Sequence, residues 1–501
     1  MSAAPDVSPT PPLTRARAFS LAWPMMFANA VLPLAGVVDT AVIAAVGDAA
    51  DLGGVALGVT LWNIAYWSFS FLRMGTTGLT AQAAGASDRA GAERPPSPPT
   101  SAHTPDLGGR DDPAEPILPV GRAEALPAAR ANALELERIL LRALAFALAL
   151  GVAILVLRRP FAAAGFVVFE GEPGVEAAGA VYFRVRSWGA PAVYASFALT
   201  GWLIGMGRTR TVMVVQAVFS AVNIALDLWF VLGLGWGVAG VAAATAIADW
   251  TAVTIAVAFT WPSLRATARA GGETLWHALR DGPALRSLVS LNAAMMVRSW
   301  ALLFGFAWFT NTAARQGAAI LAGSHVLLQI VSVWVFVLDA WALVVETAVG
   351  RAVGVRSVAE LRRAIRILGE LSIGTGAVFL AATLVFGPWV LERWIADPEA
   401  RAAALRFLPY CAAIPLVGTA AWLLDGVFIG ATASAAMRNA ALAATLLYVL
   451  LDLVLTPALG PHGMWSAFLF YYVTRAGTLL LAYPALERRA RGASAPVPPR
   501  S

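Results

Sequence analysis

Four polar residues stand in stretches that are otherwise apolar, and their types suit the binding of a cation. Asn223 and Asp227 are four residues apart, so on a helix they lie on one face, one turn from each other. Thr245 follows beyond the short turn LGLGWGVAG, and Asp39 lies in an earlier apolar run, PLAGVVDTAVIAAVG. Two carboxylates, an amide oxygen and a hydroxyl would form an all-oxygen site, which suits a proton or a small hard cation such as Na⁺.

The two acids of this set are costly to place in a membrane. A charge at the centre of a bilayer costs about 3 kcal/mol on insertion scales. Two carboxyl groups in one apolar pocket cannot easily both ionise, so we expect one of them to hold a proton. The alternative is that the acids pair with other side chains and only fix helix packing. We predict a proton or Na⁺ site formed by Asp39, Asn223, Asp227 and Thr245.

The run that contains Asp39 also contains Pro24. Proline removes a backbone hydrogen bond from a helix and permits a kink. Pro33 lies in the same run, so we predict a hinge on the same element as the acid, with a static kink as the alternative.

Other ionisable side chains also fall within apolar runs. At membrane depth such residues are functional candidates when they face a cavity or a partner. For the arginines, pairing that serves only helix packing stays an open alternative. The candidates for secondary polar sites are Arg73, Arg298, Asp339, Glu346 and Asp425, and the same runs contain Asp249, Asp452 and Arg475.

The elements that must position these residues are membrane-spanning helices. The chain has 501 residues, of which 59% are hydrophobic and only 13% charged, whereas soluble domains have roughly 25% charged residues. Apolar stretches of about 20 residues recur along its whole length. We expect an all-α integral membrane protein with about twelve spans, near 20–46, 54–83, 134–157, 178–205, 209–232, 236–261, 286–313, 318–350, 364–386, 403–430, 434–457 and 463–485.

The distribution of arginine predicts the orientation. Arginines are frequent before the first span, in alternate loops and after the last span, whereas the loop GDAADLGG carries two acids and no base. By the positive-inside rule, both termini are expected in the cytoplasm and the number of spans is even. The net charge of +6 is therefore explained by membrane topology, and we expect no nucleic-acid partner. The N-terminal segment lacks the pattern of a cleaved signal peptide.

The two halves of the chain repeat one another. The pattern LD in NIALDLWFVLGLGWG recurs in YVLLDLVLTPALGPHG, so that Asp227 pairs with Asp452. Earlier in the chain, Gly85 pairs with Gly350 across a longer interval, so the first half contains extra residues after this point. Each repeat has six spans, and we expect two six-helix lobes related by a pseudo-two-fold axis along the membrane normal.

The repeat and the loop composition predict the domain boundaries. The extra residues of the first half fall in a polar stretch rich in Pro and Gly, which is typical of a disordered loop. We expect a cytoplasmic tail at 1–19, an N-lobe at 20–261 with a disordered cytoplasmic insertion at about 87–130, a cytoplasmic linker at 262–285, a C-lobe at 286–486 and a second tail at 487–501.

Five segments together resemble one transporter family. They are PLAGVVDTAVIAAVG, SFLRMGTTGLTAQAAGA, NIALDLWFVLGLGWGVAGVAAATAIAD, HVLLQIVSVWVFVLDAWALVVETAVGRAVG and LLDGVFIGATASAAMRN. The membrane portion resembles the multidrug and toxic compound extrusion (MATE) transporters, in particular their DNA-damage-inducible DinF branch. Two departures are Asp339-Ala340, where that branch commonly reads Asp-Gly, and the long second loop.

The resemblance implies an antiporter that exports organic compounds while protons or Na⁺ enter. The cation site of the family falls on Asp39, Asn223, Asp227 and Thr245, and its first-helix proline falls on Pro24. We expect alternating access in a bacterial cytoplasmic (inner) membrane, no cofactor other than the coupling ion, and a monomer whose partners are small organic substrates and lipids.

Two functions other than antiport bear on the same residues. A flippase-type exporter of a lipid-linked or anionic substrate is the alternative, because Arg73 and Arg298 could line a cationic cavity. A membrane enzyme is not expected, because the four histidines are scattered with no metal-like spacing and the single cysteine, Cys411, suits a buried thiol.

Overall fold

The computed structural model describes residues 13–92, 120–169, 172–269 and 280–492, and over these ranges the chain is helical with short turns. The first half contains α1 (Arg15–Val46), α2 (Ala49–Phe69), α3 (Phe71–Ala92), α4 (Val120–Phe169), α5 (Pro173–Arg186), the 3-10 turn η1 (Ser187–Gly189), α6 (Ala190–Gly205), α7 (Thr209–Asp227), the π-helical turn η2 (Leu228–Gly233) and α8 (Gly237–Arg269). The second half contains α10 (Gly282–Arg315), α11 (Ala318–Val355), α12 (Val358–Trp394), α13 (Pro398–Gly430), α14 (Ser434–Leu459) and α15 (Pro461–Ala490).

These elements form twelve passes across the bundle, which confirms the all-α fold predicted from the sequence. α2 and α3 form one pass that is interrupted at Ser70, and α5, η1 and α6 form another. Within the described part of the chain, nine helical segments are long and apolar enough to cross a membrane. The remaining passes are α1, α15 and the interrupted α5–α6.

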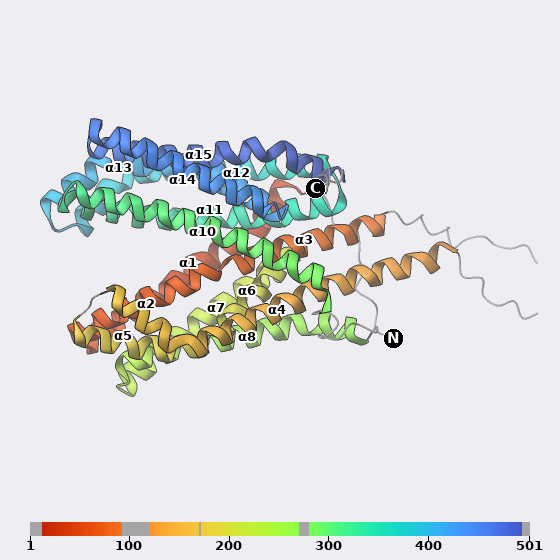
Figure 1. The fold of residues 1–501 in the computed structure, drawn as a ribbon, viewed down its shortest axis with the longest axis horizontal. Coiled ribbons are helices and arrows are strands. Elements are labelled where there is room, and N and C mark those ends of the chain that lie inside the picture. The colour runs from red at the N-terminus through yellow and green to blue at the C-terminus, as the bar shows by residue number, and fades with distance from the viewer. Residues whose placement is uncertain (1–12, 93–119, 170–171, 270–279, 493–501) are drawn as a thin grey trace, which may run out of the picture.

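The twelve passes are divided between two lobes (Figure 1). The N-lobe contains α1 to α8 and the C-lobe contains α10 to α15. Both described ends of the chain lie at the same end of the bundle, as an even number of passes requires. The lobes contact each other along α1 and α3 of the N-lobe and α11 of the C-lobe.

The internal repeat extends to the backbone conformation of the turns. Gly207, in the turn that precedes α7, has a positive φ of 74°. Thr432 is its counterpart in the repeat, in the turn before α14, and also has a positive φ, of 51°. A non-glycine residue seldom adopts this conformation, so its recurrence at matching positions reflects the shared turn and not the local residue type.

Several helices extend into segments that the sequence analysis predicted as loops or tails. α3 continues to Ala92 and α4 begins at Val120, both inside the predicted insertion at 87–130. α8 continues to Arg269 and α10 begins at Gly282, both inside the predicted linker at 262–285. α1 begins at Arg15 and α15 ends at Ala490, within the predicted tails. The rest of these segments, 1–12, 93–119, 270–279 and 493–501, lies outside the described residues.

Candidate functional site

Three helices of the N-lobe bring together the four residues predicted to bind a cation. Asp39 comes from α1, Asn223 and Asp227 come from α7, and Thr245 comes from α8. All four side chains are buried. The Asn223 amide Nδ2 donates a hydrogen bond to Thr245 Oγ1 at 3.2 Å, and this hydroxyl donates to the Val241 carbonyl at 2.9 Å. The amide oxygen of Asn223 is therefore left as an acceptor.

The carboxyl groups of Asp39 and Asp227 face each other within hydrogen-bonding reach, and Asp39 also faces Asn223. Ionised carboxylates are acceptors only, so a hydrogen bond between these two requires a proton on one of them. The buried oxygens Asp39 Oδ1, Asn223 Oδ1 and both carboxylate oxygens of Asp227 have no hydrogen-bond donor from the described residues. Buried acceptors are normally satisfied, so four acceptors without donors from the described residues form an unusual cluster.

Asp227 lies where α7 changes its helical geometry. It is the last residue of the α-helical part, and the π-helical turn η2 (Leu228–Gly233) begins directly after it. Short π-helical turns are frequent at functional sites, because the extra residue per turn changes the direction of a side chain.

A buried ion pair next to this site was missed by the sequence analysis in part. Arg186 Nη1 of α5 lies 2.5 Å from Asp249 Oδ2 of α8, one turn beyond Thr245. The Arg186 guanidinium also lies over the ring of Trp62, with its carbon 4.4 Å from the ring centroid. Asp249 was recognised as an acid at membrane depth, whereas Arg186 was not singled out. The sequence did contain a signal for Arg186, because this charged residue lies inside the predicted membrane span 178–205.

The C-lobe contains a counterpart of Asp227 in a different environment. Asp452 occupies the matching position of the repeat, on α14, and is also buried. Its carboxylate accepts hydrogen bonds from Trp308 Nε1 at 2.8 Å, Thr312 Oγ1 at 3.0 Å and Thr456 Oγ1 at 2.6 Å. The acid at this helix position thus accepts from three donors in the C-lobe, whereas its counterpart in the N-lobe faces a second acid.

The secondary polar candidates form two ion-pair groups. The Asp425 carboxylate accepts from Arg298 at 2.6 Å and from Arg475 at 2.7 Å, and all three side chains are buried. Arg73 Nη1 of α3 lies 3.5 Å from Glu346 Oε2 of α11, so this second pair joins the two lobes. Asp339 is half-buried nearby, where Arg73 and Arg298 act on it electrostatically.

The predicted hinge residue Pro24 is buried in α1, which is continuous from Arg15 to Val46. Bending at Pro24 therefore stays a prediction.

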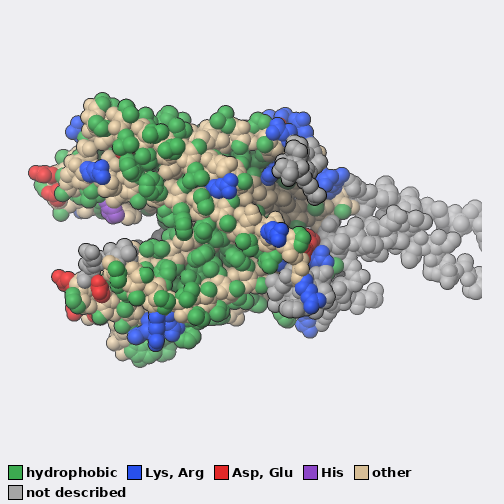
Figure 2. Space-filling view, viewed as in Figure 1, with side chains coloured by type: hydrophobic (Ala, Val, Ile, Leu, Met, Phe, Trp, Pro, Cys, Tyr) green, Lys and Arg blue, Asp and Glu red, His purple; other side chains and the backbone are tan. Residues whose placement is uncertain are grey.

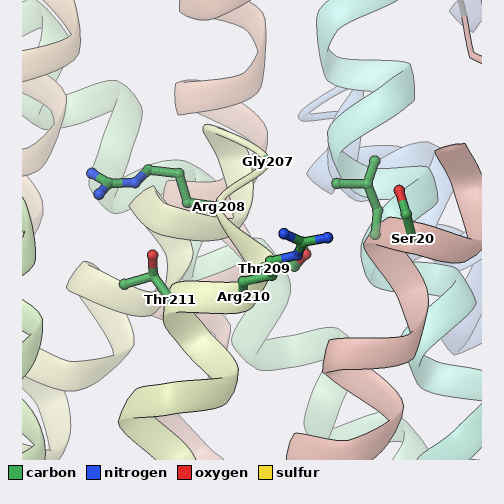
Figure 3. Close-up of a pocket in the computed structure, with 7 residues that line it drawn as sticks. Ser20, Gly207, Arg208, Thr209, Arg210 and Thr211 are labelled. Carbon is green, nitrogen blue, oxygen red and sulfur yellow. The ribbon is translucent and has the colours of Figure 1, made fainter.

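The described part of the chain offers no metal site, and the pocket between α6 and α7 lacks converging charges. No group of three or more His, Cys, Asp or Glu side chains that could hold a metal ion occurs among the described residues. A pocket of about 280 Å³ lies at the turn between α6 and α7 (Figure 3). Arg208 and Arg210 extend away from each other there, so they do not converge on one ligand. The pocket is lined by Ser20, Leu21, Gly207, Arg208, Thr209, Arg210 and Thr211.

A family model, a curated relative and several solved structures are similar to this chain. The MatE family model matches residues 24–94 and 129–229. DNA damage-inducible protein F of Escherichia coli (strain K12) is 32% identical over 473 residues, which cover 94% of this chain and 91% of that protein. A crystal structure of MATE in the bent conformation has a TM-score of 0.77 at 17% identity, covering 96% of this chain and 97% of that one. An outward-facing multidrug resistance MATE family transporter of the MOP superfamily has a TM-score of 0.75 at 17% identity, covering 96% of both chains.

Proposed function

Because the chain belongs to the MATE family of multidrug and toxic compound efflux transporters, which are secondary transporters and not enzymes, we propose that it is a cation-coupled antiporter. It exports organic compounds while a proton, or a Na⁺ ion, moves inward through the N-lobe. The observation that carries this proposal is the pair of facing acids, Asp39 and Asp227, whose buried oxygens have no donors among the described residues.

The acids act by changing the charge of the N-lobe interior. With no cation bound, two carboxylates face each other in an apolar surrounding and repel. A proton allows them to share a hydrogen bond, and a Na⁺ ion would be held by the same carboxylate, amide and hydroxyl oxygens. Cation binding then bends α1 at Pro24 and removes binding surface for the exported compound. By reciprocity, a compound that binds better without the cation weakens cation binding by the same factor.

The arrangement of the lobes supports alternating access. The space-filling view shows a hollow between the lobes at the end opposite both chain ends (Figure 2). Arginines gather at the end that carries the chain ends, which the positive-inside rule places in the cytoplasm. The hollow then opens to the outside, and rocking of the lobes about α1, α3 and α11 would open the opposite end. We place the chain in a bacterial inner membrane, where it works as a monomer.

The exported compounds are proposed to be amphipathic and drug-like. The flippase alternative depends on arginines that line a cationic cavity. Arg298 and Arg475 instead share Asp425, and Arg73 pairs with Glu346. Asp339 also lies near Arg73 and Arg298, so three acids within the protein offset the three arginines. An anionic substrate is therefore not favoured.

Coupled transport in proteoliposomes tests the proposal. We expect Asp39→Asn to abolish dye efflux driven by a proton or Na⁺ gradient, because an amide cannot exchange a proton or supply a negative charge. Insertion and thermal stability should be retained. Glu392→Gln, a change at an exposed acid, is the matched control and should transport normally. Undiminished coupled efflux by Asp39→Asn would refute the proposal.

The coupling ion is identified in the same vesicles. Transport is measured at fixed internal and external pH with and without a Na⁺ gradient, and then with a pH gradient in Na⁺-free buffer. A proton-coupled transporter responds only to the pH gradient, and a Na⁺-coupled transporter only to the Na⁺ gradient.

A further inference from the structure

The lobes are joined by reciprocal hydrogen bonds towards the end that carries the chain ends. Gln82 Nε2 of the N-lobe donates to the Gly430 carbonyl of the C-lobe at 2.9 Å. In the opposite direction, Thr347 Oγ1 of the C-lobe donates to the Ile204 carbonyl of the N-lobe at 2.9 Å. Both acceptors lie in the last turn of a helix, α13 or α6, and the Ile204 carbonyl also accepts from the Gly207 N–H. We call this contact the inner seam.

A buried ion pair joins the lobes next to the inner seam. Arg73 belongs to α3 of the N-lobe, and Glu346 belongs to α11 of the C-lobe, directly before Thr347. The side chain of Arg73 is 18% exposed and that of Glu346 is 3% exposed, so the pair is largely shielded from solvent. Opening of the inner seam must separate these two charges, because they belong to different lobes.

Glu346 is enclosed on its other side by the C-lobe itself. A Cβ atom on Gly430 of α13 would overlap the Glu346 carbonyl oxygen, so α13 packs directly against α11 at this level. The charged groups that act on Glu346 are Arg73, Asp339 and Arg298. Arg298 is already hydrogen-bonded to Asp425 of α13, which leaves Arg73 as the ion-pair partner of Glu346.

We propose that Glu346 is a second proton-binding residue, which holds the inner seam closed when ionised and releases it when protonated. Arg73 and a proton compete for the same carboxylate. Proton binding must therefore favour the state in which the pair is broken, and separation of the lobes must favour proton binding, because linkage is reciprocal.

This inference goes beyond the coupled transport proposed above, because Glu346 lies in the C-lobe whereas Asp39 and Asp227 lie in the N-lobe. A transporter with both sites would bind one proton that changes the N-lobe interior and another that unlocks the contact between lobes. Each site can be removed separately, so the two proposals can fail separately.

The experiment measures the separation of the lobes by double electron–electron resonance in nanodiscs without substrate. Cys411→Ser first removes the single native cysteine. Spin labels are then attached to the substitutions Arg210→Cys in α7 and Ala359→Cys in α12, where both native residues are exposed. Lowering the pH from about 8 to about 5 should raise the ratio of long to short distances by about fivefold, the lower limit of usual coupling factors.

Three variants distinguish a proton-dependent contact between Arg73 and Glu346 from an ion pair that only stabilises the fold. Glu346→Gln imitates the protonated acid, so the long distances should dominate at both pH values. Arg73→Met leaves the Glu346 carboxylate without its guanidinium partner in the closed state. The closed state then tolerates Glu346 best when this side chain is neutral, so lowering the pH should now favour short distances. Glu370→Gln breaks the exposed inter-lobe pair between Arg15 and Glu370 and should retain the wild-type response.

Each result supports or overturns the inference. A reversed pH response in Arg73→Met and a lost response in Glu346→Gln support it. A wild-type pH response in Glu346→Gln overturns it, as does an unchanged response in Arg73→Met. Adding Asp39→Asn to the labelled protein should leave the Glu346-dependent response in place. If instead Asp39→Asn abolishes it, the proton acts through the N-lobe alone and Glu346 is not a proton-binding latch.

Discussion

At the residue scale, Asp227 and Asp452 provide a comparison within one molecule. They occupy matching positions of the repeat, but Asp452 accepts from Trp308, Thr312 and Thr456, whereas both oxygens of Asp227 lack donors from the described residues. We expect Asp452→Asn to lower the free energy of unfolding by about 1–3 kcal/mol, because its amide group cannot accept from three donors. The number of cations moved per exported molecule should be unchanged.

Asp227→Asn should have the opposite pattern, because it relieves repulsion between two acids and removes no donor. Thermal stability should be retained or increased while coupling is lost. The two variants are compared by thermal unfolding in detergent and by the ratio of cation flux to dye flux in vesicles. If both variants lost stability and kept coupling, Asp227 would be a packing residue like Asp452.

Residue types and their spacing predicted only part of the candidate site. Asn223 and Asp227 were predicted to share a face because their spacing of four fixes it on a helix, and Thr245 follows after a short turn. The placement of Asp39 against them depends on packing between α1 and α7, which no spacing in the sequence fixes. It was predicted first from the residue type, as a second buried acid, and then also from the family resemblance. The partners of Glu346 and Asp425 come from helices far away in the chain, so no local pattern contained them.

At the scale of elements, the approach of α3 to α11 depends on glycine. A Cβ atom on Gly354 would overlap the Gln82 carbonyl oxygen, so the helices would have to move apart to admit it. We expect Gly354→Ala to destabilise the closed seam by about 1–3 kcal/mol, the usual cost of overpacking. The variant should populate the long inter-lobe distances at neutral pH and lose outward-directed efflux.

Gly374 of α12 provides the control for this prediction, because a Cβ atom there meets no atom within 4 Å. Gly374→Ala should leave the distances unchanged and stabilise the helix by up to about 1 kcal/mol. Equal effects of the two alanines would mean that helix propensity, and not the contact between lobes, controls the seam.

The ends of the elements were predicted less well than their existence. Apolar runs located the twelve passes, but the helices extend beyond them, to Ala92 in α3 and from Val120 in α4. Hydropathy reports only the part of a helix that suits lipid, whereas a helix continues into water for as long as its backbone hydrogen bonds and caps are satisfied. The predicted insertion at 87–130 was therefore too wide at both ends.

At the scale of the whole molecule, the repeat indicates which segment of the chain can be deleted without loss of transport. The interval between matching positions is longer before the predicted insertion than after it, so the first half has a segment that the second half lacks. In the second half, only Arg356 and Ser357 separate α11 from α12. Removing residues 93–132 would join Ala92 to Ala133, which match Ser357 and Val358 in the repeat.

We expect this deletion to retain coupled efflux and to change the free energy of unfolding by less than about 1 kcal/mol, because shortening the connection between two spans changes its closure entropy only slightly. Efflux in vesicles and thermal unfolding measure the two quantities. A variant in which the order of residues 93–132 is scrambled distinguishes length from sequence. If both variants insert and unfold normally but lose efflux, the segment has a sequence-specific role that the second lobe does not share. If only the deletion loses efflux, the first lobe needs a longer connection to rock than the second.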